Sequence, residues 1–511
     1  MLAIINSCAV YGLDGYKLMV EVDVNTGLAA FEIVGLPDAA VRESRERVRS
    51  AIKNSGFEFP LRRITVNLAP ADIKKEGALY DLPIAVGILA ATGQIDAARL
   101  GEAAIIGELS LDGAVRAVTG SLSMADHLRQ TEGIGSLYLP AENAEEAALA
   151  GGMDVYGVSS LRQLTEVLCG ALELPPQNAD IAKYFAAADT ADALDFSDVK
   201  GQPGVKRALE VAAAGGHNIL LIGAPGSGKT MLAKRLPGIL PALTLQEAME
   251  VTKIYSISGL LPKDQPLLTR RPFRAPHHGA SGASIIGGGA APRPGEISLA
   301  CHGVLFMDEL PEFARDVLEA LRQPLEDNIV TVARVQARIT YPARFQLVGA
   351  MNPCPCGYYG DSLKNCSCTP YARQRYLQRI SGPLLDRIDL HIDVPRVNYK
   401  EISGAGAAEE SSAAVRARVL AARQIQMRRF AGSGCTVNAQ MERKQLLACC
   451  QIDGQANMLL AEAFSRLKMS ARAHDRVLKV ARTIADLAGC EQIAAEHLAE
   501  AIQYRSLDRE Q

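Results

Sequence analysis

The sequence predicts an α/β multidomain protein built around a P-loop parallel sheet, and three observations lead to that prediction. A chain of 511 residues is too long for one hydrophobic core, because domains commonly span about 100–200 residues. The unbroken apolar run Ile219–Ile222 is typical of a parallel strand covered on both faces. A glycine-rich turn and a helical pattern follow that run directly. We therefore expect a nucleotide-binding core with a C-terminal helical lid, preceded by an α+β domain.

The composition excludes several classes of protein. The net charge of −3 at pH 7 provides no overall attraction to nucleic acid, so any such binding depends on local basic patches. Eleven cysteines in this length do not resemble a small secreted disulfide scaffold, and no signal segment opens the sequence. No run of about 18 apolar residues is present. We expect a cytoplasmic protein that does not cross a membrane.

The first region, residues 1–170, mixes strand and helix patterns and predicts an α+β domain. Strands are expected at residues 17–24, 31–34 and 64–68, and helices at residues 37–55 and 81–92. Four basic residues fall on one side of the first expected helix: Arg42, Arg45, Arg49 and Lys53. Such a stripe indicates either a solvated face or a nucleic-acid contact.

Three segments of this region carry a family resemblance: residues 107–113, 115–120 and 137–140. They resemble the proteolytic domain of Lon-type proteases and its relative in RadA. In place of the catalytic serine turn of that family, this chain has the run Tyr80-Asp81-Leu82-Pro83, and no lysine occurs in Gly120-Ser121-Leu122-Ser123. Acyl transfer needs a nucleophile and a base within hydrogen-bond reach. The resemblance therefore implies a catalytically dead domain that acts as a scaffold.

The expected boundaries follow from composition and from the later motifs. Residues 171–194 contain two consecutive prolines and little periodic apolar pattern, which predicts a linker. The nucleotide-binding core is expected at residues 195–398, and the helical lid at residues 399–511.

The expected core contains a phosphate cradle, residues 223–230. It matches every fixed position of G-x-x-x-x-G-K-[ST] through Gly223, Ala224, Pro225, Gly226, Ser227, Gly228, Lys229 and Thr230. The glycines let main-chain N–H groups turn inward, and the N-terminus of the following helix favours the same anion. Lys229 can reach the β- and γ-phosphates, and Thr230 can hold Mg²⁺. The sequence therefore predicts binding of ATP and Mg²⁺.

Polar side chains follow two further expected strands. After residues 303–307, Asp308 is placed to bind Mg²⁺ through water and Glu309 to orient and deprotonate the attacking water. After residues 345–350, the amide of Asn352 could contact the γ-phosphate or the water, or could cap a loop. Ligands of open α/β sheets bind at the carboxyl ends of the strands. We expect these side chains to lie at the edge that carries the phosphate cradle.

Parts of the core resemble AAA+ ATPases. Residues 195–202, which end at Gln202, resemble the segment that opens the adenine pocket. The resemblance implies that Asn352 is sensor 1. It also implies that Arg387, in the turn Leu384-Leu385-Asp386-Arg387, is an arginine finger that reaches a neighbouring subunit. A surface ion pair of Arg387 with Asp386 or Asp389 stays open as the alternative.

The last region has the pattern of a helical lid. A helix is expected at residues 415–430, with five exposed arginines: Arg416, Arg418, Arg423, Arg428 and Arg429. A second helix opens at Ser470. By resemblance to AAA+ lids, Arg472 is sensor 2 and contacts the γ-phosphate, with Arg476 and Arg482 as alternatives and a solvated helix face as the simpler explanation.

Longer segments carry a closer resemblance over nearly the whole chain: residues 34–37, 67–72, 270–278, 292–296, 310–313 and 352–357, with the C-terminal arginine-containing helix. They look like the ComM/YifB family of magnesium-chelatase-like AAA+ ATPases. The family implies a homo-oligomeric, hexameric ring that hydrolyses ATP, binds single-stranded or branched DNA and drives branch migration or unwinding during recombination of incoming DNA. Recombination proteins are the implied partners. Within the ring we expect residues 281–289 in the pore, with Arg274 and Arg293 near phosphates.

Four cysteines form a C-x-C pair, nine intervening residues and a second C-x-C pair: Cys354, Cys356, Cys366 and Cys368. Four thiolates so close together indicate a structural zinc ion. The one-residue gap departs from the usual two-residue gap, so unligated thiols stay open as the alternative. The adjacent His277 and His278 lack a clear third ligand and are expected as a structural pair in a loop.

Other functions remain open at this point. A magnesium-chelatase motor subunit would use the same core, but it lacks the fused N-terminal domain and the four cysteines. A regulatory AAA+ ATPase that acts on proteins is equally compatible with the core motifs. An ATP-dependent protease is disfavoured, because the serine and the lysine are missing.

Overall fold

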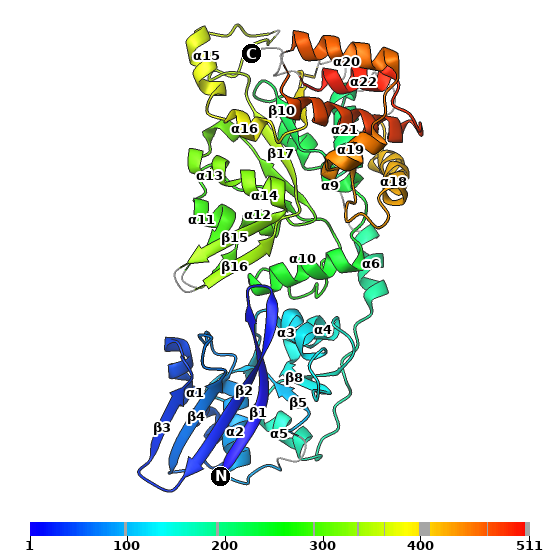
Figure 1. Cartoon of the computed structure of the whole chain (residues 1–511). Helices are drawn as coiled ribbons and strands as arrows, with labels where there is room; N and C mark the ends of the chain where they lie inside the picture. Colours follow the sequence, from blue (N-terminus) through cyan, green and yellow to red (C-terminus); the bar gives the residue numbers. More distant parts are fainter. Residues whose placement is uncertain are drawn as a thin grey trace. The chain divides into compact units, whose positions relative to one another are not determined.

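The computed structural model describes residues 1–96, 100–190, 194–289, 292–334, 337–361, 363–397, 409–467 and 469–505. The chain divides into two compact units (Figure 1). The N-terminal unit comprises Met1–Asp189 and Leu245–Thr269, and the C-terminal unit comprises Thr190–Thr244 and Arg270–Gln511. This division interrupts the core expected at 195–398. The boundary expected between residues 398 and 399 lies outside the described residues.

A mixed sheet forms the N-terminal unit. Its strands are β1 (Leu2–Tyr11), β2 (Asp14–Asn25), β3 (Ala30–Val34), β4 (Arg63–Ala69), β5 (Ala103–Ile105), β8 (Ser136–Pro140) and β9 (Asp154–Val158), while β6 (Glu108–Leu109) and β7 (Val115–Arg116) pair separately. Among the described residues the sheet has the order β3-β4-β2-β1-β5-β8-β9. β2 is antiparallel to both β1 and β4, and β3 is parallel to β4. On the other side of β1, the strands β5, β8 and β9 follow in that order, and each is parallel to the strand before it.

The helices of this region are α1 (Ala39–Asn54), α2 (Asp81–Ala91), α3 (Ser121–Leu128), α4 (Ala141–Ala148), α5 (Leu161–Leu168), α6 (Ile181–Thr190) and α10 (Leu245–Ile257). The first five pack on the sheet, and α10 contacts α3. Every residue of α2 is buried, and α2 packs against β1 and β2. The strands and helices expected in this region are confirmed, with ends shifted by a few residues. The sequence analysis missed β1, because Asn6 and Ser7 interrupt its apolar pattern; pairing with β2 along the whole strand supplies its hydrogen bonds.

The segment Leu245–Thr269 joins the N-terminal unit through α10. Its Val251 and Ile254 are buried, the Ser256 hydroxyl donates to Glu146 at 2.6 Å, and Lys253 pairs with Asp126 at 2.5 Å. Sequence spacing alone placed this segment in the core domain, because nothing local in it reveals long-range partners such as Asp126 and Glu146.

Asp81 lies in the segment where the Lon resemblance places the serine turn, and it forms a buried ion pair. Arg47 donates to Asp81 at 2.7 and 3.2 Å, and the Asp81 side chain has no exposed surface. Burial raises the pKa of Asp81, and the hydrogen bond from Arg47 opposes that rise. The arrangement is that of a structural ion pair between α1 and α2.

A parallel sheet forms the centre of the C-terminal unit. Its strands are β10 (Ile219–Ile222), β11 (Phe273–Arg274), β14 (Val304–Met307), β17 (Gln346–Met351) and β18 (Leu390–Asp393). In the described part of the unit their order is β11-β14-β17-β10-β18, and every neighbouring pair is parallel. β10, β14 and β17 are buried along their whole length, as expected for strands covered on both faces. The predicted P-loop sheet is therefore present.

The short edge strand β11 lies within residues 270–278, a segment in which the sequence analysis expected no strand. Phe273 and Arg274 pair in parallel with Val304 and Leu305 of β14. The Phe273 ring stacks on Phe306 with 5.8 Å between the ring centroids. Two residues are too few to produce a recognisable strand pattern, so only the tertiary contact with Phe306 reveals β11.

Further elements surround the sheet. They are the pairs β12 (Gly287–Gly288) with β13 (Arg293–Pro294) and β15 (Ile329–Arg334) with β16 (Ala337–Pro342), the 3-10 turns η1 (Phe196–Asp198) and η2 (Leu310–Glu312), and the helices α7 (Pro203–Gly215), α8 (Lys229–Ala233), α9 (Leu236–Ile239), α11 (Gly282–Ile286), α12 (Glu296–Leu299), α13 (Arg315–Ala320), α14 (Arg322–Asp327), α15 (Pro370–Leu377) and α16 (Gly382–Leu385). Within the described residues, no helix is both long enough and apolar enough to cross a membrane.

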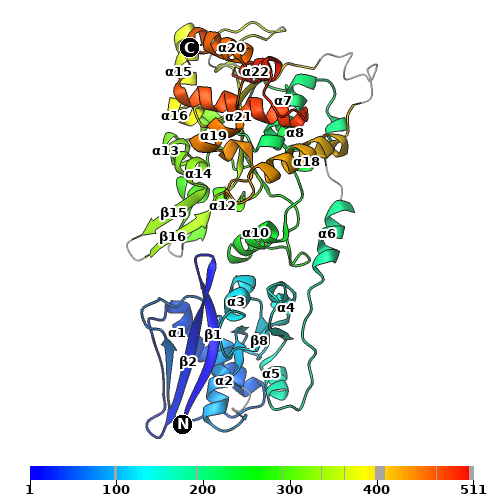
Figure 2. The ribbon, with the colours of Figure 1, turned by 45° about the vertical axis from the view of Figure 1, so that its right-hand side comes forward.

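The expected C-terminal helical region is present, and Figure 2 shows its long helices side by side. It contains α18 (Ser412–Arg429), η3 (Asn438–Gln440), α19 (Arg443–Cys449), α20 (Gly454–Arg466), α21 (Ala471–Leu487) and α22 (Ala495–Gln503). Arg428 is exposed as expected, whereas the other four α18 arginines are only partly exposed and make internal contacts. Arg416 donates to the Gly238 carbonyl at 2.8 Å, Arg423 to the Ala213 carbonyl at 2.7 Å, and Arg418 to Glu210 at 2.5 Å. These arginines join α18 to α7 and α9.

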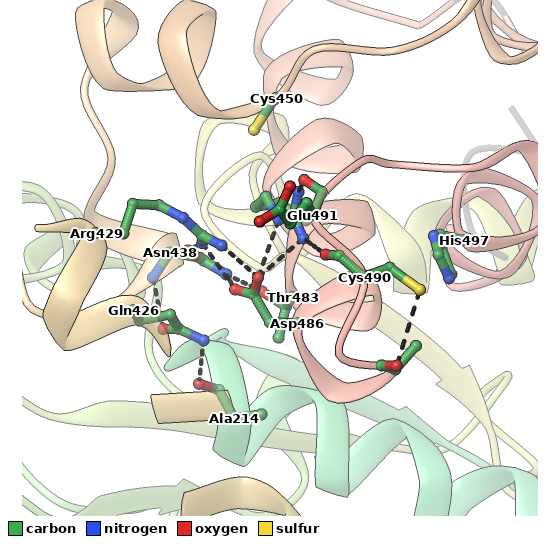
Figure 3. A network of polar contacts seen from close by, with 12 residues as sticks. Ala214, Gln426, Arg429, Asn438, Cys450, Thr483, Asp486, Cys490, Glu491 and His497 are labelled. Carbon is green, nitrogen blue, oxygen red and sulfur yellow. Dashed lines mark hydrogen bonds and ion pairs between the residues drawn. The ribbon is translucent and has the colours of Figure 1, made fainter. Parts of the chain in front are cut away.

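The fourth of these arginines, Arg429, belongs to a buried polar network around Asp486 (Figure 3). Asp486 accepts hydrogen bonds from Arg429 at 2.5 and 2.8 Å, from Asn438 at 2.8 Å and from Arg482 at 3.0 Å. Arg482 is also held by the carbonyls of Cys490 and Glu491. The network ties α18, η3 and α21 together, and Asp486 is its common acceptor.

We expect Asp486→Ala to lower the free energy of unfolding by about 3–5 kcal/mol, because it leaves two guanidinium groups buried without their anion. Urea unfolding of the full chain, followed by circular dichroism, measures this change. Asp475→Ala on the same helix is the matched control: its carboxylate is partly exposed and pairs only with the adjacent His474 in the described structure, so a change within about 1 kcal/mol is expected. Equal losses in the two variants would contradict the assigned role of Asp486.

Candidate functional site

The phosphate cradle, residues 223–230, begins where the central strand β10 ends. Because the sheet is parallel, the loops that follow β10, β14 and β17 leave at the same edge. Gly223 donates its main-chain N–H to the Met351 carbonyl at the end of β17. Asp308 follows β14, and Asn352 follows β17. The sheet thereby brings together side chains that lie more than a hundred residues apart.

The cradle has the backbone conformation that its glycines predict. Gly226 and Gly228 have φ angles of 79° and 90°, which side chains with a Cβ rarely adopt. The Lys229 ammonium lies inside the turn and donates to the carbonyls of Gly223 at 2.6 Å and Ala224 at 3.1 Å. Burial lowers the pKa of Lys229, and the nearby carboxylates of Asp308 and Glu309 raise it. A phosphate at this position would satisfy the buried cation.

Two buried polar atoms at the cradle provide a test of whether a nucleotide fits. In the described structure, the Ser227 hydroxyl and the Gln202 Oε1 atom are buried without a hydrogen-bond partner. Gln202 is held in place by its own amide, which donates to the carbonyls of Ser227 at 2.9 Å and Pro395 at 2.6 Å. Buried polar atoms are normally hydrogen-bonded. The vacant hydrogen-bonding capacity beside the glycine turn fits a polar ligand such as ATP.

The pair of residues expected to hold Mg²⁺ is in direct contact. The Thr230 hydroxyl donates to the Asp308 carboxylate at 2.8 Å. A hydroxyl beside a carboxylate, next to a phosphate cradle, is the oxygen donor set that Mg²⁺ uses with nucleotide phosphates. These residues therefore fit the metal.

Glu309 and Asn352 complete the arrangement at this edge. The Asn352 Oδ1 atom accepts from the Lys229 ammonium at 3.3 Å, so the amide lies beside the cradle. Glu309 adopts a φ of 52°, and its carboxylate is about half exposed. The structure thus places Lys229, Thr230, Asp308, Glu309 and Asn352 around one site.

Sequence reasoning missed His278, which it described as half of a structural loop pair. The Nδ1 atom of His278 lies 3.2 Å from the Glu309 carboxylate, and its ring meets Phe313 edge-on. His278 follows β11, which runs parallel to β14, so the two strands direct His278 and Glu309 to the same edge. Recognition of β11 as a strand would have revealed this contact. Its two residues left no periodic signal.

Arg387 lies away from the cradle of its own chain. It precedes the amino end of β18, whereas the cradle follows the carboxyl end of the neighbouring parallel strand β10. The Arg387 guanidinium is buried against Glu326 at 2.5 Å and against the Pro383 carbonyl at 2.6 Å. The alternative of a surface pair with Asp386 or Asp389 is therefore contradicted.

The three candidate sensor 2 arginines differ in their surroundings. Arg482 is held in the buried network of Asp486, and Arg476 pairs with Asp389 at the amino end of β18. Arg472 is exposed. Arg387 lowers the pKa of Glu326 through its hydrogen bond, and Arg472 adds to that effect by its charge. Arg472 thus lies on the side of Arg387 and Glu326.

The segment expected in the ring pore is more regular than a loop. Residues 281–289 contain α11, capped by the Ser281 hydroxyl, and β12, which pairs with β13. Arg274 is joined to Glu296 by two hydrogen bonds of 2.7 and 2.8 Å. Arg293, on β13, is exposed. Of the two arginines expected near phosphates, Arg274 is paired with a carboxylate.

The four cysteines of the C-x-C pairs converge, and we call them the cysteine cluster (Cys354, Cys356, Cys366 and Cys368). Their sulfur atoms lie 3.4–3.6 Å apart in the three pairs of Cys354, Cys356 and Cys366, and Cys368 accepts from the main-chain N–H of Cys356. Main-chain N–H groups of Tyr358 and Ser367 lower the pKa of Cys356 to about 5, which favours the thiolate that binds metals. All eleven cysteines lie within the described residues and are free of disulfides.

Comparison with known families matches three parts of the chain. The family described as magnesium chelatase, subunit ChlI, matches residues 195–402, which include the whole phosphate cradle. Subunit ChlI of Mg-chelatase matches residues 20–143, and the C-terminal family of magnesium chelatase, subunit ChlI, matches residues 409–505. These matches agree with an AAA+-type core that is followed by a helical region.

Similar proteins extend the comparison to the full length. The chain is 45% identical over 510 residues to the competence protein ComM of Haemophilus influenzae, with 99% of this chain and 98% of that protein covered. It is 45% identical over 513 residues to the protein YifB of Escherichia coli, with the same coverage. The magnesium-chelatase 38 kDa subunit of Rhodobacter capsulatus is 28% identical over 187 residues, which cover 33% of this chain and 53% of that subunit. The chain therefore belongs to the ComM/YifB family of magnesium-chelatase-like proteins.

Proposed function

We propose that this protein is a cytoplasmic, ATP-hydrolysing ring motor that binds DNA and promotes branch migration or unwinding during recombination of incoming DNA. The observation that carries the proposal is the division of the site. Lys229, Asp308, Glu309 and Asn352 surround one cradle, whereas Arg387 lies at the opposite end of the strands. A second copy of the chain would supply the missing arginine. The name of the similar protein ComM links the family to competence.

In the proposed reaction, water attacks the γ-phosphorus of bound ATP, the bond from that phosphorus to the β–γ bridging oxygen breaks, and ADP and phosphate leave. Main-chain N–H groups of the cradle and the Lys229 ammonium bind the phosphates, and Thr230 and Asp308 would hold Mg²⁺. When bound, Mg²⁺ neutralises charge on the phosphate oxygens. Glu309 accepts the proton of the attacking water, and Asn352 orients the water or the γ-phosphate. His278 positions the Glu309 carboxylate through their 3.2 Å contact.

Assembly is part of the proposed mechanism. The proposal places Arg387 of one subunit at the cradle of the next, and repetition of that contact generates a closed ring, which we propose to be a hexamer. Arg472 lies close enough to Glu326 to lower its pKa, so both arginines belong to one side of the subunit. We propose that Arg472 acts as sensor 2 from that side, on the γ-phosphate of a neighbouring subunit.

The N-terminal unit is proposed to be a Lon-like scaffold without protease activity. Asp81 occupies the position of the serine turn, and its buried pair with Arg47 leaves no nucleophile there. The proposed partners of the ring are DNA and recombination proteins. Because the net charge of the chain is −3, we expect DNA to bind local basic side chains that face the pore.

We also propose that the cysteine cluster holds one structural Zn²⁺. Zinc with four thiolates at about 2.3 Å requires sulfur–sulfur distances of about 3.8 Å, close to the 3.4–3.6 Å observed. A disulfide would need about 2.05 Å. When bound, zinc would cross-link the two C-x-C pairs, and four protein ligands would leave no open position for catalysis.

Two other functions remain candidates. The three matches to magnesium chelatase families favour a motor subunit that drives metal insertion into a porphyrin with partner subunits. A regulatory ATPase that acts on proteins uses the same core. The extent of the similarity favours the DNA motor: the chain is 45% identical to ComM over 510 residues but 28% identical to the magnesium-chelatase 38 kDa subunit over only 187 residues.

The test is an ATPase assay with and without single-stranded or branched DNA, followed by incubation with labelled three-way and four-way junctions. We expect DNA to raise the ATPase rate, and ATP to be required for exchange of the labelled strands. Lys229→Ala is the matched control, which should neither hydrolyse ATP nor move the junction. ATPase activity that DNA does not change, with intact junctions, would contradict the DNA motor and favour the two other candidates.

A further inference from the structure

The cysteine cluster lies directly against the catalytic edge of the sheet. Cys354 is two residues after Asn352, and its side chain is completely buried. Asn352 in turn contacts Lys229 at 3.3 Å. Any movement of the cluster therefore reaches Asn352 through two residues of main chain. A zinc site placed only to hold a distant loop closed would have no such connection.

A second contact joins the cluster to the cradle itself. Gly357, which follows the first C-x-C pair, has a φ of 85° and donates its N–H to the Cys354 carbonyl at 2.9 Å. A Cβ at Gly357 would lie 2.7 Å from the Pro225 ring and 3.9 Å from Asn352. The glycine thus fills the space between the cluster, Pro225 of the cradle and the Asn352 amide.

Further contacts hold the loop between the two C-x-C pairs. The Asp361 carboxylate accepts from the main-chain N–H groups of Leu363 and Lys364 and from Arg396 at 2.5 Å. Arg396 follows Pro395, whose carbonyl accepts from the Gln202 amide. The cysteine loop is therefore anchored beside both the cradle and the predicted adenine segment.

The main chain of Asn352 lies near α15 on the other side of the loop. Burial raises the pKa of Tyr376 on α15 to about 12, and the main chain of Asn352 opposes that rise. α15 begins directly after the second C-x-C pair, with Thr369 as its N-cap. The cluster thus lies between Asn352 and α15, whose Tyr376 is near the main chain of Asn352.

We propose that zinc in the cysteine cluster positions Asn352 and Pro225 for hydrolysis, so that metal occupancy controls the rate of ATP turnover rather than the binding of ATP. The inference rests on the proposed ATPase function and on the proposed zinc site. The cysteines act as positioning residues through Asn352, because none of them belongs to the phosphate cradle or follows β14 with the carboxylates. Loss of the metal would free the two C-x-C pairs and the turn at Gly357.

The first test removes the metal. Cys354→Ser and Cys366→Ser should lose the zinc that elemental analysis finds at about one per chain in the wild type. Their kcat should fall roughly 10- to 100-fold, as expected for a small misplacement of catalytic groups. The dissociation constant for a fluorescent ATP analogue should stay within about threefold, because no residue of the cradle is replaced. Cys169→Ser, an exposed cysteine in the N-terminal unit, is the control and should behave as the wild type.

The second test keeps the metal and changes only the contact. Gly357→Ala places a methyl group against Pro225, whereas Gly360→Ala has nearly the same φ, 76° against 85°, and open space around its Cβ. Both variants should retain zinc, and both carry the same backbone strain. Only Gly357→Ala should lower kcat by roughly 10-fold or more. Equal turnover in the two alanine variants would overturn the proposed coupling.

The outcomes distinguish failure of this inference from failure of the proposed ATPase function and of the proposed zinc site. Wild-type protein that hydrolyses ATP but contains no zinc, or contains iron, would overturn the zinc site and with it this inference, while the ATPase function stands. Cysteine variants that lose zinc and keep the wild-type kcat would overturn the coupling, while the ATPase function stands. Wild-type protein without ATPase activity would instead contradict the proposed function.

Discussion

Glu309→Gln is expected to stop ATP hydrolysis while ATP still binds. The substitution removes the carboxylate that accepts the proton of water, and general-base catalysis contributes about 10²–10⁴-fold to a rate. The side chain is about half exposed, so its replacement by an amide of the same shape leaves the fold intact. We expect kcat to fall by that factor and the dissociation constant for ATP to change by less than about threefold.

The measurement is steady-state phosphate release together with equilibrium binding of a fluorescent ATP analogue. Glu312→Gln is the matched control, because Glu312 lies three positions away, is partly exposed and pairs with Arg379 at 2.6 Å. It should keep nearly the wild-type kcat. If Glu309→Gln turned over at the rate of Glu312→Gln, another group would have to accept the proton.

Arg387→Ala is expected to lower kcat by roughly 10³–10⁵, the range measured for arginine fingers. The physical reason is loss of a cation from the charge that develops on the transferred phosphoryl group. In the single chain the Arg387 guanidinium is buried against Glu326, itself an anion. In the proposed ring, Arg387 exchanges that carboxylate for the γ-phosphate of the neighbouring site, so a positive group meets a negative one in both states.

A mixing experiment separates action in trans from action within one chain. Arg387→Ala and Lys229→Ala subunits should each be inactive alone. Mixed in equal amounts, they should restore about a quarter of the interfaces, because those combine an intact cradle with an intact arginine from the next subunit. Arg379→Ala, which removes a surface arginine paired with Glu312, is the control and should stay active. A mixture without any recovery would contradict the intersubunit site.

Much of the candidate site could be predicted because it is encoded in short contiguous segments. The run Ile219–Ile222 and the glycines after it determine a buried strand and an inward-turning loop without help from distant residues. Two further apolar strands are each followed by a polar side chain, which predicts that Asp308 and Asn352 lie beside Lys229 and Thr230. The structure agrees, since Thr230 donates to Asp308 at 2.8 Å and Lys229 donates to Asn352 at 3.3 Å. The parallel sheet carries this inference, since it sends the strand ends to one edge.

Elements without a local pattern were the ones missed. β1 carries Asn6 and Ser7 in its centre and forms because β2 pairs with it along its whole length. β11 is too short to show periodicity. Because β11 was not predicted, the contact of His278 with Glu309 was not predicted either. The segment Leu245–Thr269 looked like part of the core until its contacts with Asp126 and Glu146 were seen.

The sequence by itself determined the phosphate cradle, the carboxylates, the parallel sheet and the four cysteines, because each depends on neighbours in the chain. Only the tertiary structure decided which charges are paired. In the tertiary structure, four α18 arginines make internal contacts and Arg387 pairs with Glu326. Arg476 and Arg482 are paired with Asp389 and Asp486, which distinguishes them from Arg472. The cysteine cluster lies against Asn352 and Pro225. Backbone conformation follows from local sterics, whereas the partner of a long charged side chain depends on which distant elements pack beside it.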